Sequence, residues 1–375
     1  MATTESTPRE NAQINTWVAL LGCKDEPTDG VEDYCVFLGR ALEKRGVRLE
    51  RARVSWREQG WLRSLRELWR ETKGWRGRWV LLQYTSLGWS RRGFPFGAVA
   101  VLAVFWQRGV RCAVVFHDAH GFYGYRAVDR FRRFCQHWTM GRAYRLAQRS
   151  IFTIPFENIG WLPKFPTKAA FIPIGANIPE VKIWREESCP GTSQPKTIAV
   201  FGVTGGDEIA REVRDIAYAI QYVSEKHSQV RLLVIGRNSK EADASLRSAL
   251  PGAGVVINTL GVVPAEELAR RISDADVLLF VRGCIAGTRG SLIAGIACGL
   301  PIVGYSGPET KFPITQAGLQ LAPYGDQDAL AIALEEVLSN DRLRRDLRSR
   351  SLRAYANHFS WEKIAERFTA ELTHA

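Results

Sequence analysis

The chain has 375 residues, 46% of them hydrophobic, and a formal net charge of +12. This size and composition predict about two globular domains with full cores. The first fifteen residues are polar, so we expect no secretory signal. Seven scattered cysteines without a C-x-x-C pair, and six histidines that do not cluster with them, exclude a disulfide framework or a zinc site. The pattern favours reduced thiols in a cytoplasmic protein with no bound metal.

The excess positive charge is confined to the first half of the chain. Residues 1–175 contain 28 Lys and Arg against 15 Asp and Glu, whereas the remainder is close to neutral. Such a field attracts lipid headgroups, nucleic acid or phosphorylated substrates. The uncharged stretch 93–106 is shorter than the ~18–20 residues that span a bilayer, so we interpret it as a buried helix.

Short apolar runs alternate with helical spacing throughout the first half. The segment 31–45 has helical periodicity, and a plausible helix separates each of the other strands. The predicted strands are 17–22, 47–54, 79–83, 112–116, 150–154 and 170–174. Strands that alternate with helices predict a parallel sheet covered on both faces. We assign residues 1–180 to this first domain.

A polar, Pro- and Ser-containing stretch at 181–196 is the expected linker, and a second alternation follows it. The predicted strands are 197–201, 230–235, 255–258, 277–280 and 301–303, and the predicted helices are 209–225, 240–250, 266–273 and 291–298. The chain from 326 to 372 is almost all helical in pattern. We therefore expect an α/β fold of two doubly wound, Rossmann-like domains that face a cleft, with the second at 197–355. Ligands of such sheets bind beyond the carboxyl ends of the strands.

The stretch Thr288-Arg289-Gly290-Ser291 carries the strongest functional signal. It is a polar loop that leads into a short small-residue helix, a glycine stop and a buried strand. A helix N-terminus presents free backbone N–H groups and positive potential, which suit phosphate. The planar guanidinium of Arg289 adds a permanent charge. The alternative is that Arg289 is a solvated surface charge.

Several motifs, in this order and spacing, are similar to a known family over nearly the whole chain. They are Asp29-Gly30-Val31-Glu32, Phe116-His117-Asp118, Ile172-Pro173-Ile174-Gly175-Ala176-Asn177, Leu260-Gly261-Val262-Val263-Pro264 and Phe359-Ser360-Trp361-Glu362. The chain resembles the GT-B retaining glycosyltransferases, in particular bacterial family-4-like enzymes of polysaccharide biosynthesis. The resemblance implies sugar transfer from a UDP- or GDP-linked donor to a glycan or lipid-linked acceptor. The resemblance implies that no metal and no tightly bound cofactor is needed. It also implies that a last helix at 356–375 returns to the first domain.

The chain departs from the family pattern at two places. The family carries two Glu, associated with donor sugar and ribose, where this sequence has Ala286 and Ala294. An Arg…Lys pair after the first strand of the donor domain is replaced by Phe201-Gly202-Val203-Thr204-Gly205-Gly206. A second hypothesis is therefore a catalytically silent GT-B scaffold or binding subunit.

The candidate site residues follow from these motifs and from the chemistry of a departing diphosphate. For donor binding we predict Gly202, Thr204, Gly205, Arg237, Thr288, Arg289, Gly290, Ser291 and Glu309. The glycines permit close backbone approach, although an ordinary strand-to-helix turn would also use them. For catalysis we predict His117, which could instead be a core histidine, and Asp118. Gly30 and Val31 are predicted to shape the acceptor side, and a simple turn is the alternative.

Tryptophan, leucine and arginine alternate at helical spacing through residues 56–78. The segment is either a core-facing helix with a solvated side or an interfacial helix that holds the enzyme on an anionic membrane. We therefore expect a cytoplasmic protein, peripheral on the inner face of the plasma membrane. Nucleic-acid binding is disfavoured because no recognised module is present. A dinucleotide-dependent oxidoreductase is disfavoured because no G-x-G-x-x-G follows the first strand.

Overall fold

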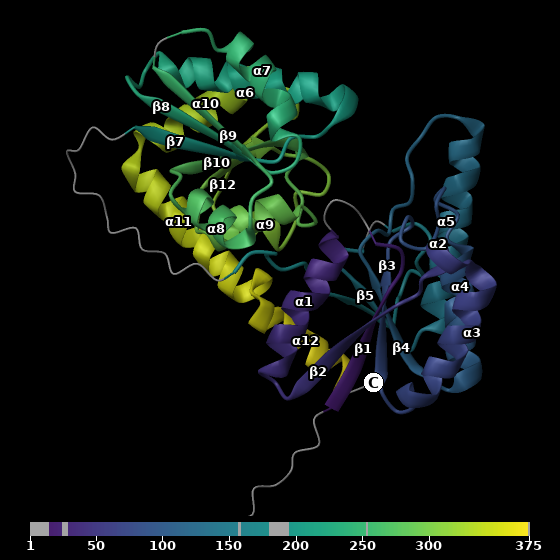
Figure 1. The fold of residues 1–375 in the computed structure, drawn as a ribbon. Coiled ribbons are helices and arrows are strands. Elements are labelled where there is room, and N and C mark those ends of the chain that lie inside the picture. Colours follow the sequence, from purple (N-terminus) through teal and green to yellow (C-terminus); the bar gives the residue numbers. More distant parts are fainter. Residues whose placement is uncertain (1–14, 25–28, 157–158, 180–194, 253, 374–375) are drawn as a thin grey trace, which may run out of the picture. The chain divides into compact units, whose positions relative to one another are not determined.

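The computed structural model describes residues 15–24, 29–156, 159–179, 195–252 and 254–373 (Figure 1). The chain forms two compact units. The first comprises residues 1–151, 159–170 and 365–375, and the second comprises 152–158 and 171–364. Each unit is built on a six-stranded sheet with alternating helices, so the predicted doubly wound α/β fold is confirmed. The linker predicted at 181–196 lies almost entirely outside the described residues.

The first sheet has the strand order β2-β1-β3-β4-β5-β6. Its strands are β1 (Asn15–Leu21), β2 (Val47–Arg53), β3 (Trp79–Tyr84), β4 (Arg111–Phe116), β5 (Arg149–Phe152) and β6 (Ala169–Phe171). The central ladders are parallel, with Asn15 opposite Val47 and Trp79 opposite Arg111. Every residue of β3 is buried, as expected for a strand covered on both faces.

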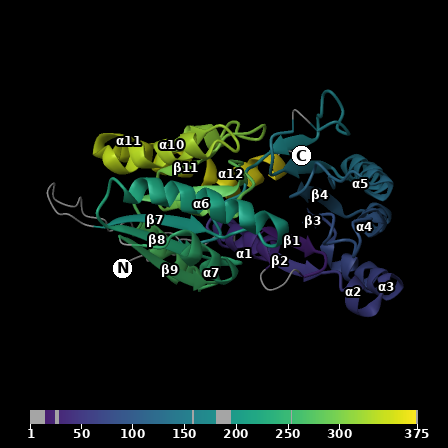
Figure 2. The same cartoon turned by 90° about the horizontal axis from the view of Figure 1, so that it is seen from above.

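Helices cover both faces of this sheet. They are α1 (Gly30–Glu43), α2 (Trp56–Gln59), α3 (Trp61–Glu71), η1 (Thr72–Trp75), α4 (Phe96–Arg108) and α5 (Ala127–Leu146). Helices α3, α4 and α5 lie side by side along one face, and α1 covers the other (Figures 1 and 2).

The uncharged stretch 93–106 forms most of α4. This helix buries Ala98, Val101, Leu102 and Phe105, one stripe at helical spacing, and ends at left-handed Gly109. The prediction of a packed helix is therefore confirmed. Within the described parts of the chain, no helix combines the length and the apolar character needed to cross a bilayer.

The amphipathic stretch 56–78 is not one helix. Gly60 has φ +80°, a backbone conformation that favours glycine, and it separates α2 from α3. A 3₁₀ turn, η1, then ends the helical stretch. Trp56 and Leu68 are buried, whereas Leu62 is 78% exposed. The segment therefore packs against its unit and still presents apolar side chains to solvent.

The second sheet has the strand order β12-β11-β10-β7-β8-β9. Its strands are β7 (Lys196–Phe201), β8 (Val230–Ile235), β9 (Val255–Gly261), β10 (Val277–Cys284), β11 (Ile302–Tyr305) and β12 (Leu319–Ala322), the last of which the sequence did not reveal. The helical elements are η2 (Gly206–Glu208), α6 (Ile209–Ser224), α7 (Ser239–Ala249), α8 (Ala265–Ser273), α9 (Gly290–Ala297), η3 (Ile314–Gln316), α10 (Gln327–Ser339), α11 (Asp341–Ala354), the π-helical turn η4 (Tyr355–Phe359) and α12 (Trp361–Thr373).

Two cores lie on opposite faces of the second sheet because successive strand residues point in opposite directions. Ile198 and Val200 of β7 belong to the core that contains residues of α6 and α10. Ala199 belongs to the core that contains residues of α8 and α9. Helix α9 packs closely on the sheet because it carries Gly295, where a Cβ would lie 2.5 Å from Leu278. The small residues that the sequence showed here therefore serve helix-to-sheet packing.

Both ends of α12 are fixed by tryptophan hydrogen bonds. In the second unit, Trp361 Nε1 donates to the Ala176 carbonyl at 2.6 Å, and its ring fills the space beside Gly175. In the first unit, Trp79 Nε1 donates to the Leu372 carbonyl at 2.9 Å. The last residues of the chain thus belong to the unit that the first residues build.

Candidate functional site

The loop after β7 is fixed by backbone hydrogen bonds to the loop after β8. Gly202 N donates to the Ile235 carbonyl at 2.7 Å, and Val203 N donates to the Arg237 carbonyl at 3.1 Å. Gly202 has φ +78°, and a Cβ here would lie 2.9 Å from Arg282 Nη1. The left-handed backbone therefore favours glycine at this position, and a side chain here would displace the end of the Arg282 side chain.

Two further contacts hold the predicted Thr204–Gly205 backbone. Thr204 N donates to Oε2 of Glu212, a buried residue of α6, at 2.8 Å. Asn238 has φ +55°, and its side-chain amide donates to the Val203 carbonyl at 3.0 Å. Gly205 lies against the same amide, because a Cβ there would be 3.0 Å from Asn238 Nδ2. The loop is therefore held in one conformation before any ligand binds.

Arg282, which the sequence analysis did not select, lies at the end of β10 beside Gly202. Its Nε is buried and has no hydrogen-bond partner in the described part of the chain. Burial lowers the pKa of the Arg282 guanidinium, and the positive charges of Arg289 and Arg237 lower it further against the opposing charge of Glu212. Arg237, Arg282 and Arg289 are therefore close enough at this edge for their positive charges to act on one another, an arrangement that an anion would stabilise.

The predicted motif Thr288 to Ser291 forms the N-terminus of α9. Arg289 is the N-cap residue, with φ −89° and ψ 99°, and Gly290 and Ser291 begin the helix. The first N–H groups of a helix have no acceptor within it, so they face outward at the positive end of the dipole. The Arg289 guanidinium lies 4.0 Å from the Cβ position of Gly283. It is therefore directed back toward the end of β10.

The loop that carries Glu309 is fixed to the same edge. Thr310 Oγ1 donates to the Ile285 carbonyl at 2.7 Å and accepts from Gly307 N at 2.9 Å. Burial raises the pKa of the nearby Cys284 thiol. The charges of Arg211, Glu309 and Arg289 also act on this pKa. Glu309 and Arg289 thus lie around one thiol, and both side chains are exposed.

The structure therefore gathers the predicted donor residues at one edge of one sheet. Gly202, Arg237, Arg282 and Arg289 follow or end β7, β8 and β10, and these strands are neighbours in the order β10-β7-β8. Arg237 is exposed, as Arg289 is. This carboxyl edge combines backbone N–H groups with three cations, and it suits a diphosphate.

Both alanines that depart from the family pattern are buried. Ala286 is 3% exposed and Ala294 is 1% exposed, and Ala294 belongs to the core that covers α9. Neither position presents a side chain to solvent. A carboxylate at Ala294 would enter an apolar core in this structure.

His117 follows β4 in the first unit, as predicted. Its Nε2 lies 2.8 Å from Gln83 Oε1, and its ring meets Tyr34 edge-on at 4.8 Å. Burial lowers the pKa of His117 to about 4, although the negative charge of Asp29 acts in the opposite direction. The imidazole is therefore neutral at neutral pH and contacts its partners through hydrogen bonds rather than charge.

The predicted residue Asp118 lies next to His117 and accepts from Ser86 Oγ at 3.0 Å. Its negative charge and burial together raise the pKa of the Tyr84 phenol above its usual range, with burial the larger cause. The carboxylate therefore lies at the carboxyl ends of β3 and β4, beside the neutral imidazole.

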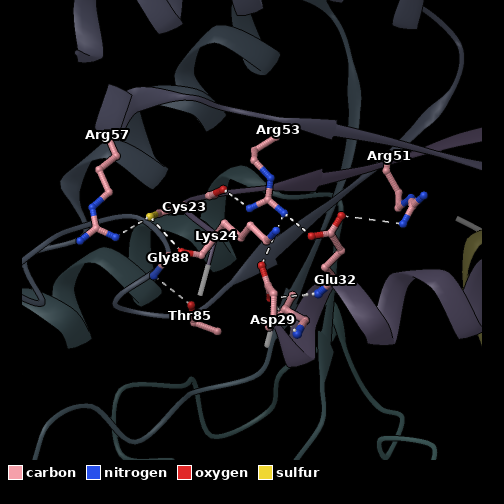
Figure 3. Close-up of polar contacts among 11 residues, drawn as sticks. Cys23, Lys24, Asp29, Glu32, Arg51, Arg53, Arg57, Thr85 and Gly88 are labelled. Atoms are coloured by element: carbon pink, nitrogen blue, oxygen red, sulfur yellow. Dashed lines mark hydrogen bonds and ion pairs between the residues drawn. The ribbon is translucent and has the colours of Figure 1, made fainter. Parts of the chain in front are cut away.

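Gly30 and Val31 start α1 at the same edge of the first sheet. Asp29 caps the helix, because its Oδ1 accepts from the N–H groups of Val31 and Glu32 at 3.1 Å. Arg53 joins both carboxylates, with Nη2 2.9 Å from Glu32 and 3.4 Å from Asp29 (Figure 3). Among the described residues, and apart from its chain neighbours and the backbone of α1, no heavy atom lies within 4 Å of where a Cβ at Gly30 would be. Because Asp29 also acts on the pKa of His117, the predicted acceptor residues and His117 share one edge.

Comparison with known proteins identifies the type of fold that the chain has. Residues 198–340 match a family model described as Glycosyl transferases group 1. Sucrose-phosphate synthase from Thermosynechococcus elongatus is 17% identical, with a TM-score of 0.66 over 96% of this chain and 98% of that one. The chain has the GT-B fold. No curated protein matches the sequence.

Two further GT-B structures show the same likeness at low identity. Anabaena HepE in complex with UDP-glucose is 12% identical, with a TM-score of 0.64 over 96% of this chain and 100% of that one. MurG of Acinetobacter baumannii is 12% identical, with a TM-score of 0.55 over 96% and 99%. The group 1 match covers the edge that carries Gly202, Arg237, Arg282 and Arg289. In the described residues, no group of three His, Cys, Asp or Glu could hold a metal ion.

Proposed function

We propose that this protein is a retaining glycosyltransferase that moves a sugar from a UDP- or GDP-linked donor to a glycan or lipid-linked acceptor. The observation that carries the proposal is that Arg237, Arg282 and Arg289 all lie at the carboxyl edge of the strands β10, β7 and β8, where the positive charges of Arg237 and Arg289 act on Arg282. Diphosphate is the departing group of a nucleotide sugar, and it gains negative charge as the anomeric C–O bond breaks. Fixed cations aimed at that charge lower the barrier.

The proposal assigns a role to each cluster. The N–H groups of Gly290 and Ser291, with the three guanidiniums, hold the diphosphate, and Glu309 binds a sugar or ribose hydroxyl. The acceptor hydroxyl oxygen forms the new bond to the anomeric carbon as the bond from that carbon to the diphosphate oxygen breaks, and the hydroxyl proton passes to the departing diphosphate. Neutral His117 contacts the sugar or a phosphate, and Asp118 orients the acceptor next to the space at Gly30. We assign no protein nucleophile.

The proposed transfer can be tested by measuring donor binding and the anomeric configuration of the product. The purified protein is titrated with UDP, GDP and their glucose conjugates in a thermal-shift panel, and one base should raise the melting temperature selectively. Arg289→Ala should remove that shift and the hydrolysis of the preferred donor. Proton NMR of the first-formed product should show the anomeric configuration of the donor. An inverted product would remove the retaining assignment and leave the transferase assignment in place.

The second candidate is a catalytically silent GT-B scaffold, which buried Ala286 and Ala294 favour. It predicts a thermal shift with a nucleotide but no donor turnover in wild type. Arg289-dependent hydrolysis of any nucleotide sugar would exclude it.

We further propose that the enzyme works in polysaccharide biosynthesis at the inner face of the plasma membrane. The basic excess of the first 175 residues supports this location. Sedimentation with vesicles of 30% phosphatidylglycerol at low salt, and its loss at high salt, tests the association. Failure to sediment at low salt would overturn it.

A further inference from the structure

An open groove of about 690 Å³ lies in the first unit between α3, the loop at 89–95 and α4. Its walls are mostly apolar and aromatic, and they include Trp56, Trp61, Leu65, Trp89, Phe94 and Phe96. Trp56 and Trp61 stack with ring centres 5.2 Å apart. Trp61 can lie against α4 because Gly97 has no side chain, and a Cβ there would be 2.0 Å from its ring.

The mouth of this groove is cationic. Arg91 and Arg92 line it with exposed side chains, and none of the described residues that line it is acidic. The loop that carries them is turned by Ser90, whose Oγ accepts from Phe94 N at 2.8 Å. Arg91 is placed by a hydrogen bond to the Arg57 carbonyl at 3.1 Å. An apolar channel with two guanidiniums at its opening matches a hydrocarbon chain that ends in a phosphate.

The groove continues into exposed aromatic side chains on α5. Phe94 contacts Phe131 with ring centres 6.1 Å apart, and Phe96 contacts Trp138 at 5.9 Å. Phe131 is 60% exposed and Trp138 is 45% exposed. Helices α3, α4 and α5 lie side by side there (Figures 1 and 2). Exposed aromatics among arginines are typical of surfaces that lie in the headgroup region of a bilayer.

The groove is also joined to the predicted acceptor residues. Trp89 Nε1 donates to the Gln83 carbonyl at 2.8 Å, and the side chain of Gln83 holds His117 at 2.8 Å. The loop at 89–95 that lines the groove therefore follows β3 at the same sheet edge as His117, which follows β4.

We propose that this groove binds the hydrocarbon chain of a phosphate-bearing lipid, with Arg91 and Arg92 on its phosphate. The inference rests on the proposed transferase function and names the class of its acceptor as lipid-linked through phosphate. The aromatic face of α5 holds the first unit on the bilayer from which the lipid is taken.

The test is calorimetric binding of farnesyl phosphate below its micellar concentration, with farnesol and inorganic phosphate as separate arms. We expect farnesyl phosphate to bind about tenfold or more tightly than either. Arg91→Glu with Arg92→Glu should weaken it by about tenfold or more. Lys73→Glu with Arg76→Glu makes the same charge change on exposed side chains before β3, away from the groove, and should have no effect.

Ala100→Trp fills the groove from α4 and should abolish binding of the chain while UDP binding persists. Equal binding of inorganic phosphate or farnesol, or unchanged affinity in both groove variants, would overturn the proposal. UDP titration of the same preparations separates the two proposals. In the wild-type protein, absent lipid binding with intact UDP binding contradicts only the groove, and lipid binding without UDP binding contradicts only the donor site.

Discussion

Gln83 and His117 form a hydrogen-bonded pair at the carboxyl ends of β3 and β4, with Gln83 buried, His117 partly exposed, and Gln83 Oε1 2.8 Å from His117 Nε2. The amide nitrogen of Gln83 donates to the Leu81 carbonyl at 3.2 Å, so its oxygen is the acceptor in the pair. The hydrogen-bond network therefore assigns the proton to Nε2 of the neutral ring, and Nδ1 keeps its lone pair. The unprotonated Nδ1 of His117 can therefore accept a hydrogen bond.

This pair predicts a pH dependence of stability. The pKa of His117 is lowered to about 4 in the folded protein from an ordinary value of 6.5, so protonation favours the unfolded chain. The stability that the neutral His117 side chain contributes is fully present above pH 6.5 and is lost as the pH falls toward 4. The unfolding free energy of wild type, relative to His117→Asn, should fall by about 2 kcal/mol between pH 7.5 and pH 4.5. Urea unfolding at both pH values measures it, and a constant difference would contradict the assignment.

Arg282 should contribute to donor binding but not to stability. Arg282→Gln removes one of three converging charges, and the affinity for UDP should fall by about tenfold or more. The unfolding free energy should stay the same or rise, because a partly buried cation is removed. Isothermal titration and urea unfolding measure the two effects. Arg231→Gln, on the exposed start of β8, is the matched control. An unchanged UDP affinity would exclude Arg282 from the site.

The sequence predicted the alternation of both units because buried parallel strands are continuous apolar runs. β7 at Lys196–Phe201 and α9 at Gly290–Ala297 lie within a residue or two of their predicted bounds. The edge strand β12 was missed, since Leu319–Ala322 is short and half exposed. Gly60 was also missed as a break, because helical spacing continues on both sides of it.

The candidate site was predictable only where a loop motif marked it. Thr288 to Ser291 stood out as a polar loop before a small-residue helix. Arg282 and Gln83 did not stand out, because each lies inside an apolar strand and acts through neighbours distant in sequence. Asn238 was missed because asparagine, although enriched in left-handed backbone, is also common in ordinary turns, so the residue type alone does not mark the conformation. Such roles depend on which strands are neighbours, β10-β7-β8 in the second sheet and β3-β4 in the first, and local patterns do not fix this order.

Asn238 should stabilise the donor loop in two separable ways. Asn238→Gly keeps the left-handed conformation and removes only the hydrogen bond to Val203, so we expect a loss of about 1 kcal/mol. Asn238→Ala removes the bond and adds backbone strain, so the loss should be about 2 kcal/mol. Urea unfolding of both variants measures the difference. Equal stability of the two would show that the backbone conformation at this position is unstrained.

Restoring the family carboxylate at Ala294 should fail. Ala294 is 1% exposed within an apolar core, so Ala294→Glu buries an ionisable group without a described partner. We expect a loss of about 3 kcal/mol or more in unfolding free energy and no gain in affinity for a nucleotide sugar.

Ala297→Glu is the control for this change, since it places the same side chain on the same helix at a half-buried position. It should cost clearly less, because the carboxylate can reach water. Urea unfolding and calorimetric titration with UDP-glucose measure both variants. A stable Ala294→Glu protein that binds UDP-glucose more tightly would show that α9 has room for the family's sugar-binding carboxylate.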